Sequence, residues 1–161
     1  MKKFIYTLLI TIALTNNSFS AGTSNDSSDG SSSYTKAKNL IKAAKKYEKK
    51  GKTEKAKKRY AKAQKLLLKS NKEKPLQADT LNYLGFTTRK LGDYEKGEAF
   101  YLQGLKIEPN HNGINEYLGE LYIATNRVDL AKERLNILKS CDCKEYKQLK
   151  EIVEGTKKSK Y

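Results

Sequence analysis

Residues 78 to 111 are the most informative stretch of the chain, because they have the pattern of two helices joined by a tight bend. Apolar residues recur at helical spacing in the first half, and a second apolar face follows after Gly92-Asp93 interrupts the pattern. Pro109 closes the stretch, since proline lacks an amide proton and clashes with the preceding helical turn. The pattern predicts one complete helical hairpin.

The hairpin recurs along the chain at an interval of 34 residues. A shift forward by that interval places Leu84-Gly85 on Leu118-Gly119 and Gly92 on Asn126. A less regular copy lies nearer the N-terminus, and seven residues, 71 to 77, separate it from the second copy. The predicted hairpins span residues 37–70, 78–111 and 112–145.

This period, the Leu-Gly pairs and the late proline resemble the tetratricopeptide repeat, a helix-turn-helix unit. The resemblance implies an all-α fold, a right-handed α-solenoid of three hairpins, within a domain spanning residues 34–161. Such an array needs a polar cap at its end, and the sequence offers a last helix at residues 144–154. Asp142 and Glu145, three residues apart, have the pattern of a capping pair for the start of that helix.

The N-terminus has the composition of an export signal, with Lys2 and Lys3 followed by an apolar run over residues 4–14. Small residues then lead to Ala21, so we expect a signal peptide at residues 1–20. The alternative is a membrane anchor, but the run is shorter than the roughly 20 apolar residues that span a bilayer. Residues 21–33 are rich in Ser and Gly and should form a flexible tether. The sequence therefore predicts an exported protein, periplasmic as the first expectation and secreted as the second.

Positive charge is concentrated in the first predicted hairpin. Residues 36–75 hold 17 Lys or Arg against three acidic residues, whereas residues 76–161 hold 14 against 13. Such a basic block favours an anionic partner: a membrane surface, an envelope polymer or an acidic protein. Nucleic acid is disfavoured, because 16 of the 17 are Lys, which lacks the forked geometry of Arg. A solvated helix surface without a partner is the alternative.

In the family that the chain resembles, the first helix of each repeat lines a concave groove that suits an extended peptide or a helix. The resemblance implies a groove graded from basic to acidic, with Phe86 as an exposed apolar anchor near its middle and Arg89 beside it. The alternative for Phe86 is packing against the neighbouring hairpin. The implied groove residues are Lys45, Lys49, Asn82, Phe86, Arg89, Lys90, Glu116 and Glu120.

One branch of that family grips a C-terminal carboxylate with Lys, Asn and Arg side chains at groove positions. Asn82 and Arg89 match part of that set. Gly113 and Tyr117 stand where it needs basic residues, so we do not expect this clamp.

Cys141 and Cys143 are the only cysteines, and in an exported chain they favour a disulfide. With one residue between them the ring is small, so the bond would be strained and easily reduced. Two unpaired thiols, or a redox or soft-metal role, are the alternatives. Two thiolates are too few for a tetrahedral zinc site, and the sole histidine, His111, lies in a predicted turn where a capping or surface role is expected. We expect no metal site and no cofactor.

The sequence shows no recognisable catalytic constellation. It lacks a glycine-rich phosphate loop, a His-Glu-x-x-His motif and a nucleophile with a base. We therefore expect a non-catalytic interaction protein that holds a protein or peptide segment in its groove. The rival expectation is a thiol-redox or metal-handling accessory in which Cys141 and Cys143 are the working groups.

Overall fold

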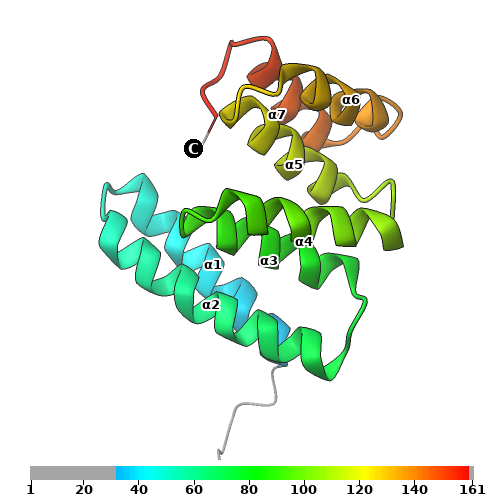
Figure 1. Ribbon diagram of the computed structural model, residues 1–161. Helices are drawn as coiled ribbons and strands as arrows, with labels where there is room; N and C mark the ends of the chain where they lie inside the picture. Colours follow the sequence, from blue (N-terminus) through cyan, green and yellow to red (C-terminus); the bar gives the residue numbers. More distant parts are fainter. Residues whose placement is uncertain (1–31, 160–161) are drawn as a thin grey trace, which may run out of the picture.

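The computed structural model describes residues 32–159, and this part of the chain consists of seven α-helices without a strand (Figure 1). The helices are α1 (Ser33–Lys49), α2 (Thr53–Glu73), α3 (Ala78–Lys90), α4 (Tyr94–Ile107), α5 (Asn112–Ala124), α6 (Val128–Leu138) and α7 (Lys144–Val153). The expected signal peptide, residues 1–20, and residues 21–31 of the expected tether lie outside the described residues. No helix within residues 32–159 is long and apolar enough to cross a membrane.

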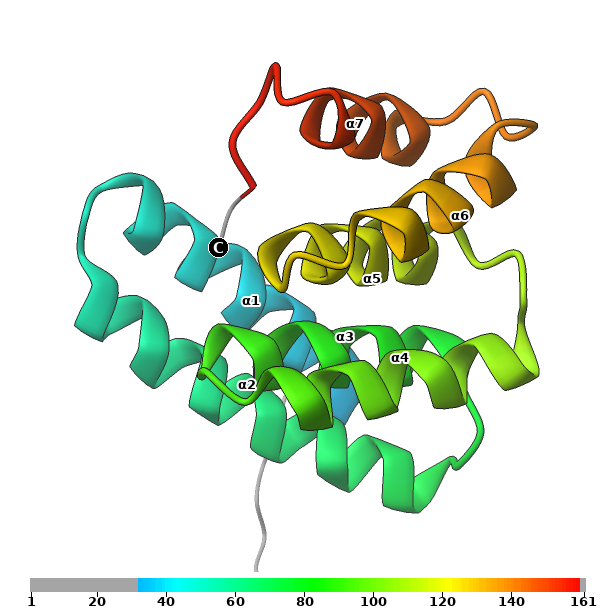
Figure 2. The ribbon, with the colours of Figure 1, turned by 45° about the horizontal axis from the view of Figure 1, so that its top comes forward.

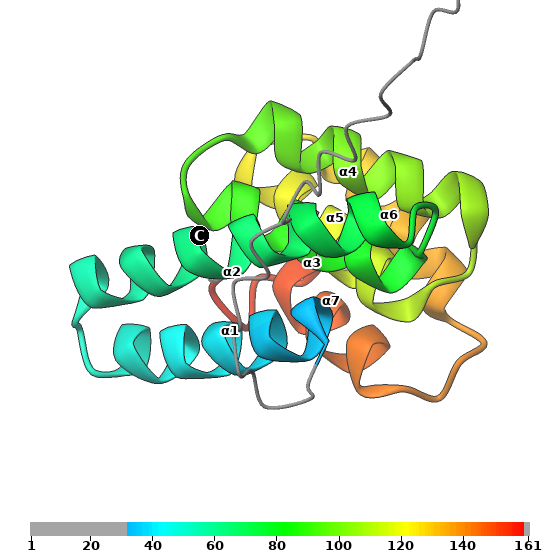
Figure 3. The ribbon, with the colours of Figure 1, turned by 90° about the horizontal axis from the view of Figure 1, so that it is seen from below.

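The first six helices pair in chain order into three hairpins, and the hairpins stack on one another. In Figure 2, α2 lies lowest, α3 and α4 lie above it, α5 and α6 follow, and α7 lies at the top. Figure 3 shows α1 and α2 side by side at the N-terminal end of the stack. Successive hairpins meet through α2 on α3 and α4 on α5, while α7 packs on both α5 and α6. This arrangement confirms the predicted all-helical solenoid.

The bends inside the three hairpins share one backbone conformation. Gly51, Gly92 and Asn126 each follow the first helix of a hairpin, with φ of +67°, +101° and +58°. Glycine adopts this left-handed region without strain, and asparagine tolerates it better than most residues. Asn126 therefore serves in the third hairpin where Gly92 serves in the second.

The first helix begins within the segment expected to be a tether. α1 starts at Ser33, and the Ser32 hydroxyl accepts a hydrogen bond from the Thr35 amide at 3.2 Å. That contact satisfies one of the amides that the first helical turn leaves open. The described fold thus includes two of the thirteen residues expected in the tether.

The start of α7 differs from the sequence expectation. Cys143 is the N-cap residue, and it makes no side-chain hydrogen bond to the helix. Asp142 stands one position too early to cap, and its exposed carboxylate instead lies 3.9 Å from Lys147 Nζ. The predicted capping pair of Asp142 and Glu145 is therefore wrong.

The apolar faces of the hairpins close over two buried clusters. The first joins the first two hairpins, and four of its buried residues are the alanines Ala37, Ala44, Ala56 and Ala63. The second joins the second and third hairpins, around the buried side chains Tyr101, Ile114, Leu118 and Leu121. Because each cluster takes side chains from two hairpins, a single hairpin cannot bury its own apolar face, and stability depends on stacking.

The two Leu-Gly pairs allow unusually close packing. A Cβ on Gly85 would lie 2.5 to 2.8 Å from three ring atoms of Tyr101, which is fully buried. A Cβ on Gly119 would lie 2.6 to 2.8 Å from the two methyl carbons of Leu149. The two glycines occupy equivalent positions, but they accommodate different neighbours. Gly85 makes room for the Tyr101 ring of its own hairpin, and Gly119 makes room for Leu149 of the terminal helix α7.

Replacing Gly85 by alanine should lower the free energy of unfolding by about 1–3 kcal/mol, because the new methyl group overpacks the core against Tyr101. Urea unfolding followed by circular dichroism measures the change. In a Tyr101→Leu background the same substitution should cost less, since the obstructing ring is absent. An equal cost in both backgrounds would show that Tyr101 is not the obstacle.

Candidate partner-binding groove

A groove runs across the first helices of the three hairpins. Its larger part is a pocket of about 760 Å³ between α1, α3 and α5, and a smaller pocket of about 400 Å³ continues it toward α7. Lys45 and Tyr117 line both pockets, so the two are contiguous. The larger pocket is lined by Lys42, Lys45, Lys46, Glu48, Lys49, Thr53, Phe86, Lys90, Tyr117 and Glu120.

The rim of the larger pocket along α1 is basic. Three exposed lysines on one face of the helix form this α1 rim: Lys42, Lys46 and Lys49. The two acids of the pocket have cationic partners of their own, since Glu48 pairs with Lys90 at 2.8 Å and Glu120 pairs with Arg89 at 3.7 Å. Neither acid therefore cancels the charge of the α1 rim.

Aromatic rings form the floor of the larger pocket. Phe86 packs edge-on against Tyr60 of the first hairpin, with ring centroids 5.7 Å apart, and its ring is tilted against that of Tyr117 of the third, at 5.1 Å. Lys45 Nζ lies 4.4 Å from the Phe86 ring centroid and donates a hydrogen bond to the Tyr117 hydroxyl at 3.2 Å. Only 4% of Phe86 is exposed, so the expectation of an exposed anchor is wrong. Rings from both neighbouring hairpins cover it.

Arg89 lies beneath the floor and not in the groove. It is 1% exposed, and its Nη1 donates a hydrogen bond to the Tyr117 carbonyl at 2.8 Å. Its Nη2 lies 3.7 Å from a carboxylate oxygen of Glu120, whose side chain is also fully buried. Burial lowers the pKa of Arg89 from its ordinary value, and the neighbouring Tyr101 and Glu120 oppose that shift. Arg89 therefore ties α3 to α5, and the expected direct contact with a partner is corrected to a structural role.

The smaller pocket is mixed in charge. Asn82 and Glu116 line it, and both side chains are almost fully buried. Lys144 and Glu145 of α7 complete its far side. The groove thus changes from strongly basic beside α1 to mixed beside α7.

The structure divides the eight expected groove residues between three places. Asn82 and Glu116 line the smaller pocket, and Arg89 lines neither pocket. The remaining five residues line the larger pocket: Lys45, Lys49, Phe86, Lys90 and Glu120.

Five residues that line the larger pocket were not among those predicted: Lys42, Lys46, Glu48, Thr53 and Tyr117. The two lysines precede Lys49 by seven and three residues, which places all three on one helix face. That spacing could have identified them from the sequence. Tyr117 offered no such signal, because its role depends on contacts with the other two hairpins.

The cysteines lie away from this groove. Cys141 and Cys143 form a disulfide in the turn between α6 and α7, and neither lines the two pockets. In the part of the chain that the structure describes, no three His, Cys, Asp or Glu side chains gather as a metal-binding group. His111 is the N-cap of α5, since its Nδ1 accepts a hydrogen bond from the Ile114 amide at 3.2 Å.

Comparison with known proteins bears on the fold. The family model described as the tetratricopeptide repeat matches residues 78–111. The Yersinia enterocolitica type III secretion translocator chaperone SycD is similar in structure, with a TM-score of 0.53 and 14% identity over 73% of this chain and 81% of that chain. The first TPR of Spaghetti (RPAP3), bound to the HSP90 peptide SRMEEVD, has a TM-score of 0.48 and 17% identity over 76% of this chain and 94% of that chain. No curated protein matches the sequence.

Removing one member of the buried ion pair should destabilise the fold. Glu120→Gln should lower the free energy of unfolding by about 3 kcal/mol, because it removes the carboxylate 3.7 Å from the buried Arg89 charge. Replacing both partners, as Arg89→Met with Glu120→Leu, should recover most of the loss. Urea unfolding at neutral pH measures all three proteins.

An exposed pair provides the matched control. Glu54→Gln removes a carboxylate 3.8 Å from Lys57 on the surface of α2 and should change stability by less than about 1 kcal/mol. If Glu120→Gln proved as mild as this control, the buried pair would not hold α3 and α5 together.

Proposed function

We propose that the chain, whose residues 78–111 match the tetratricopeptide-repeat model, is a non-catalytic binding module whose groove holds an acidic segment of a protein partner. The observation that carries the proposal is the larger pocket, a cavity of about 760 Å³ with a basic rim and an aromatic floor. Its size falls within the range of ordinary ligand sites.

The charge of the larger pocket indicates what kind of partner segment it would bind. The α1 rim carries three cations on one side of the pocket, while both acids of the pocket are already paired with Lys90 and Arg89. An acidic segment would meet a favourable field there, and this field would also speed its approach. A basic segment would be repelled.

The aromatic floor adds a requirement for an apolar side chain. The Phe86 and Tyr117 rings meet at 5.1 Å and close the bottom of the pocket between the three hairpins. Burial raises the pKa of the Tyr117 hydroxyl further above the physiological range, in which tyrosine is already neutral. A segment with acidic residues around one apolar or aromatic residue would therefore complement both rim and floor.

The proposed setting is outside the cytoplasm, and its support is the signal-like pattern of residues 1–20. The partner is then an envelope or secreted protein. In SycD the same fold belongs to a chaperone of a translocator, and that protein's partner is accordingly another protein.

The experiment compares two triple variants with equal charge change, using residues 21–161, which contain the whole described fold. Lys42→Gln, Lys46→Gln and Lys49→Gln together neutralise the α1 rim. Lys58→Gln, Lys62→Gln and Lys65→Gln together neutralise three exposed lysines of α2, none of which lines the pocket.

The probe is a fluorescein-labelled peptide of alternating Glu and Leu, measured by anisotropy against an analogue with Gln in place of Glu. Neutralising the α1 rim should weaken binding of the Glu peptide at least tenfold, about 1.4 kcal/mol. The α2 variant should stay within about twofold of the parent. Equal losses in both variants would mean that net charge alone attracts the peptide, and tight binding of the Gln analogue would exclude an acidic specificity.

Phe86 and Arg89 are unsuited to this test. Both are buried, so their replacement by alanine would disturb the stacking of the hairpins as well as the groove. The exposed α1 rim separates binding from folding. A pull-down from envelope extract with the parent and the α1 rim variant would then identify the natural partner.

A further inference from the structure

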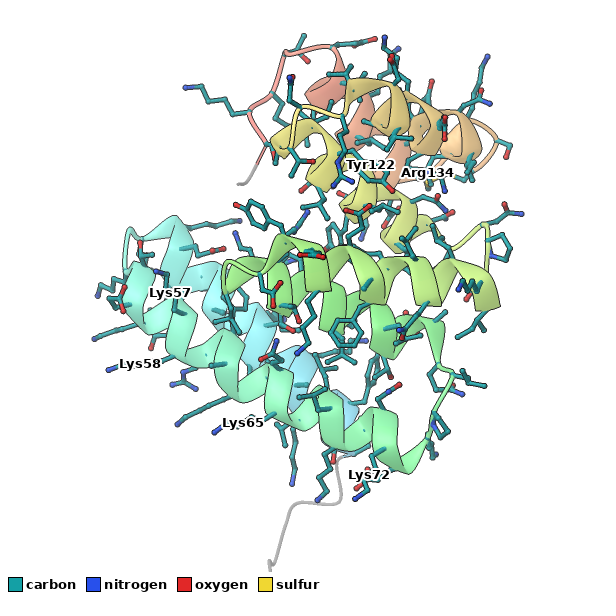
Figure 4. All side chains as sticks on the ribbon, viewed as in Figure 1. Lys57, Lys58, Lys65, Lys72, Tyr122 and Arg134 are labelled. Carbon is teal, nitrogen blue, oxygen red and sulfur yellow. A yellow bond between two sulfur atoms is a disulfide. The ribbon has the colours of Figure 1, made fainter. Side chains whose placement is uncertain are left out.

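A second basic surface lies on the outer side of α2. Six lysines follow one another at alternating intervals of three and four residues, which aligns them along one face of the helix. We call them the lysine row: Lys55, Lys58, Lys62, Lys65, Lys69 and Lys72. All six are exposed, and in Figure 4 the labelled Lys58, Lys65 and Lys72 extend outward from α2.

The lysine row faces away from the body of the protein. The side of α2 that packs on its neighbours carries Ala56, Tyr60, Ala63 and Leu67, all of which are buried. The row occupies the opposite side of the same helix, and none of its members lines the larger or the smaller pocket. A ligand on the row would therefore leave the groove open.

The charge of the row is largely uncompensated. Among residues 32–159, Lys69 is the only member with a carboxylate within ion-pair distance, Glu73 at 3.8 Å. Glu54, at the start of the helix, pairs with Lys57, which lies outside the row. Like charges one helical turn apart repel each other, so the helix carries an electrostatic cost that an anionic surface would relieve.

The dimensions of the row suit a flat surface. From Lys55 to Lys72 it spans 17 residues of helix, which at 1.5 Å per residue is about 26 Å. Lysine side chains carry point charges on flexible stems and do not form the two-pronged contacts of arginine. They suit laterally mobile phosphate headgroups better than a ligand of fixed geometry.

An exposed leucine stands beside the row. Leu68 lies three residues after Lys65 and four before Lys72, so it is adjacent to both on the helix surface, and 48% of it is exposed. A soluble polyanion has no apolar region in which the Leu68 side chain could be buried. A bilayer offers it the boundary between headgroups and acyl chains, where apolar side chains of surface-bound helices are buried.

We propose that the lysine row docks the protein on the surface of an anionic phospholipid bilayer, with α2 lying along the membrane plane and Leu68 entering the headgroup boundary. The attraction is electrostatic and falls with salt, since exposed charges are screened within about 8 Å at physiological ionic strength. The protein is then held at the surface while its groove remains open to a partner.

Vesicle sedimentation tests the proposal with residues 21–161. On vesicles of phosphatidylglycerol and phosphatidylcholine, the variant with Lys58→Gln, Lys62→Gln and Lys65→Gln should bind about a hundredfold more weakly than the parent. The variant with the α1 rim neutralised has the same net charge and should bind within about threefold of the parent. Parent binding should disappear on pure phosphatidylcholine and fall steeply with added sodium chloride.

The competing occupant, a linear polyanion, is tested with inorganic polyphosphate and the variant Leu68→Ser. Leu68→Ser should weaken vesicle binding severalfold and leave polyphosphate binding unchanged.

Equal weakening of vesicle binding by both triple variants would overturn the proposal, because it would reduce the effect to net charge. Strong binding of polyphosphate through the row, together with Leu68→Ser having no effect on vesicles, would assign the row to a polymer and overturn the membrane assignment. Circular dichroism of each variant establishes that the fold is retained.

Discussion

A buried guanidinium group holds the second and third hairpins in position. Arg89 of α3 donates to the Tyr117 carbonyl and faces the Glu120 carboxylate, both on α5, with the Tyr101 ring of α4 beside it. Two charges removed from water cost free energy that their attraction seldom exceeds, so the pair contributes geometry more than stability. The groove depends on that geometry, because its floor and one of its walls lie on the two helices that Arg89 joins.

The hairpins differ in how they fill their cores, and this explains where charge can accumulate. The first hairpin buries four alanines together with Ile41, Tyr60 and Leu67, and most of its other positions face solvent. Those positions carry 17 basic residues against three acids over residues 36–75. The result is two basic surfaces on one hairpin, the α1 rim inside the groove and the lysine row outside it. The second and third hairpins, with larger buried side chains, supply the rigid platform against which α1 completes the groove.

The repeat pattern predicted correctly which face of each first helix lies toward the groove. It did not predict how deeply the side chains on that face are buried. Lys45 and Lys49 line the larger pocket as expected, and within residues 32–159 α1 lies at the end of the stack of hairpins. Phe86 occupies on α3 the position that Lys45 occupies on α1, but α3 has a hairpin on each side, and Tyr60 and Tyr117 cover the Phe86 ring. The position of a residue in the repeat predicts the helix face on which its side chain lies. Whether that side chain is exposed to solvent depends on the neighbouring hairpins.

The sequence by itself determined the helical hairpins, their interval, their bends at Gly92 and Asn126, and the concentration of charge in the first hairpin, because these follow from local periodicity, left-handed backbone positions and composition. Export through residues 1–20 stays a prediction. Only the tertiary structure shows that Arg89 and Glu120 are buried together and that Tyr117 forms part of the floor of the larger pocket. It also shows that the α1 rim lines the groove whereas the lysine row lies outside it. These features arise between hairpins, from side chains far apart in the chain, and no local pattern specifies which of them meet.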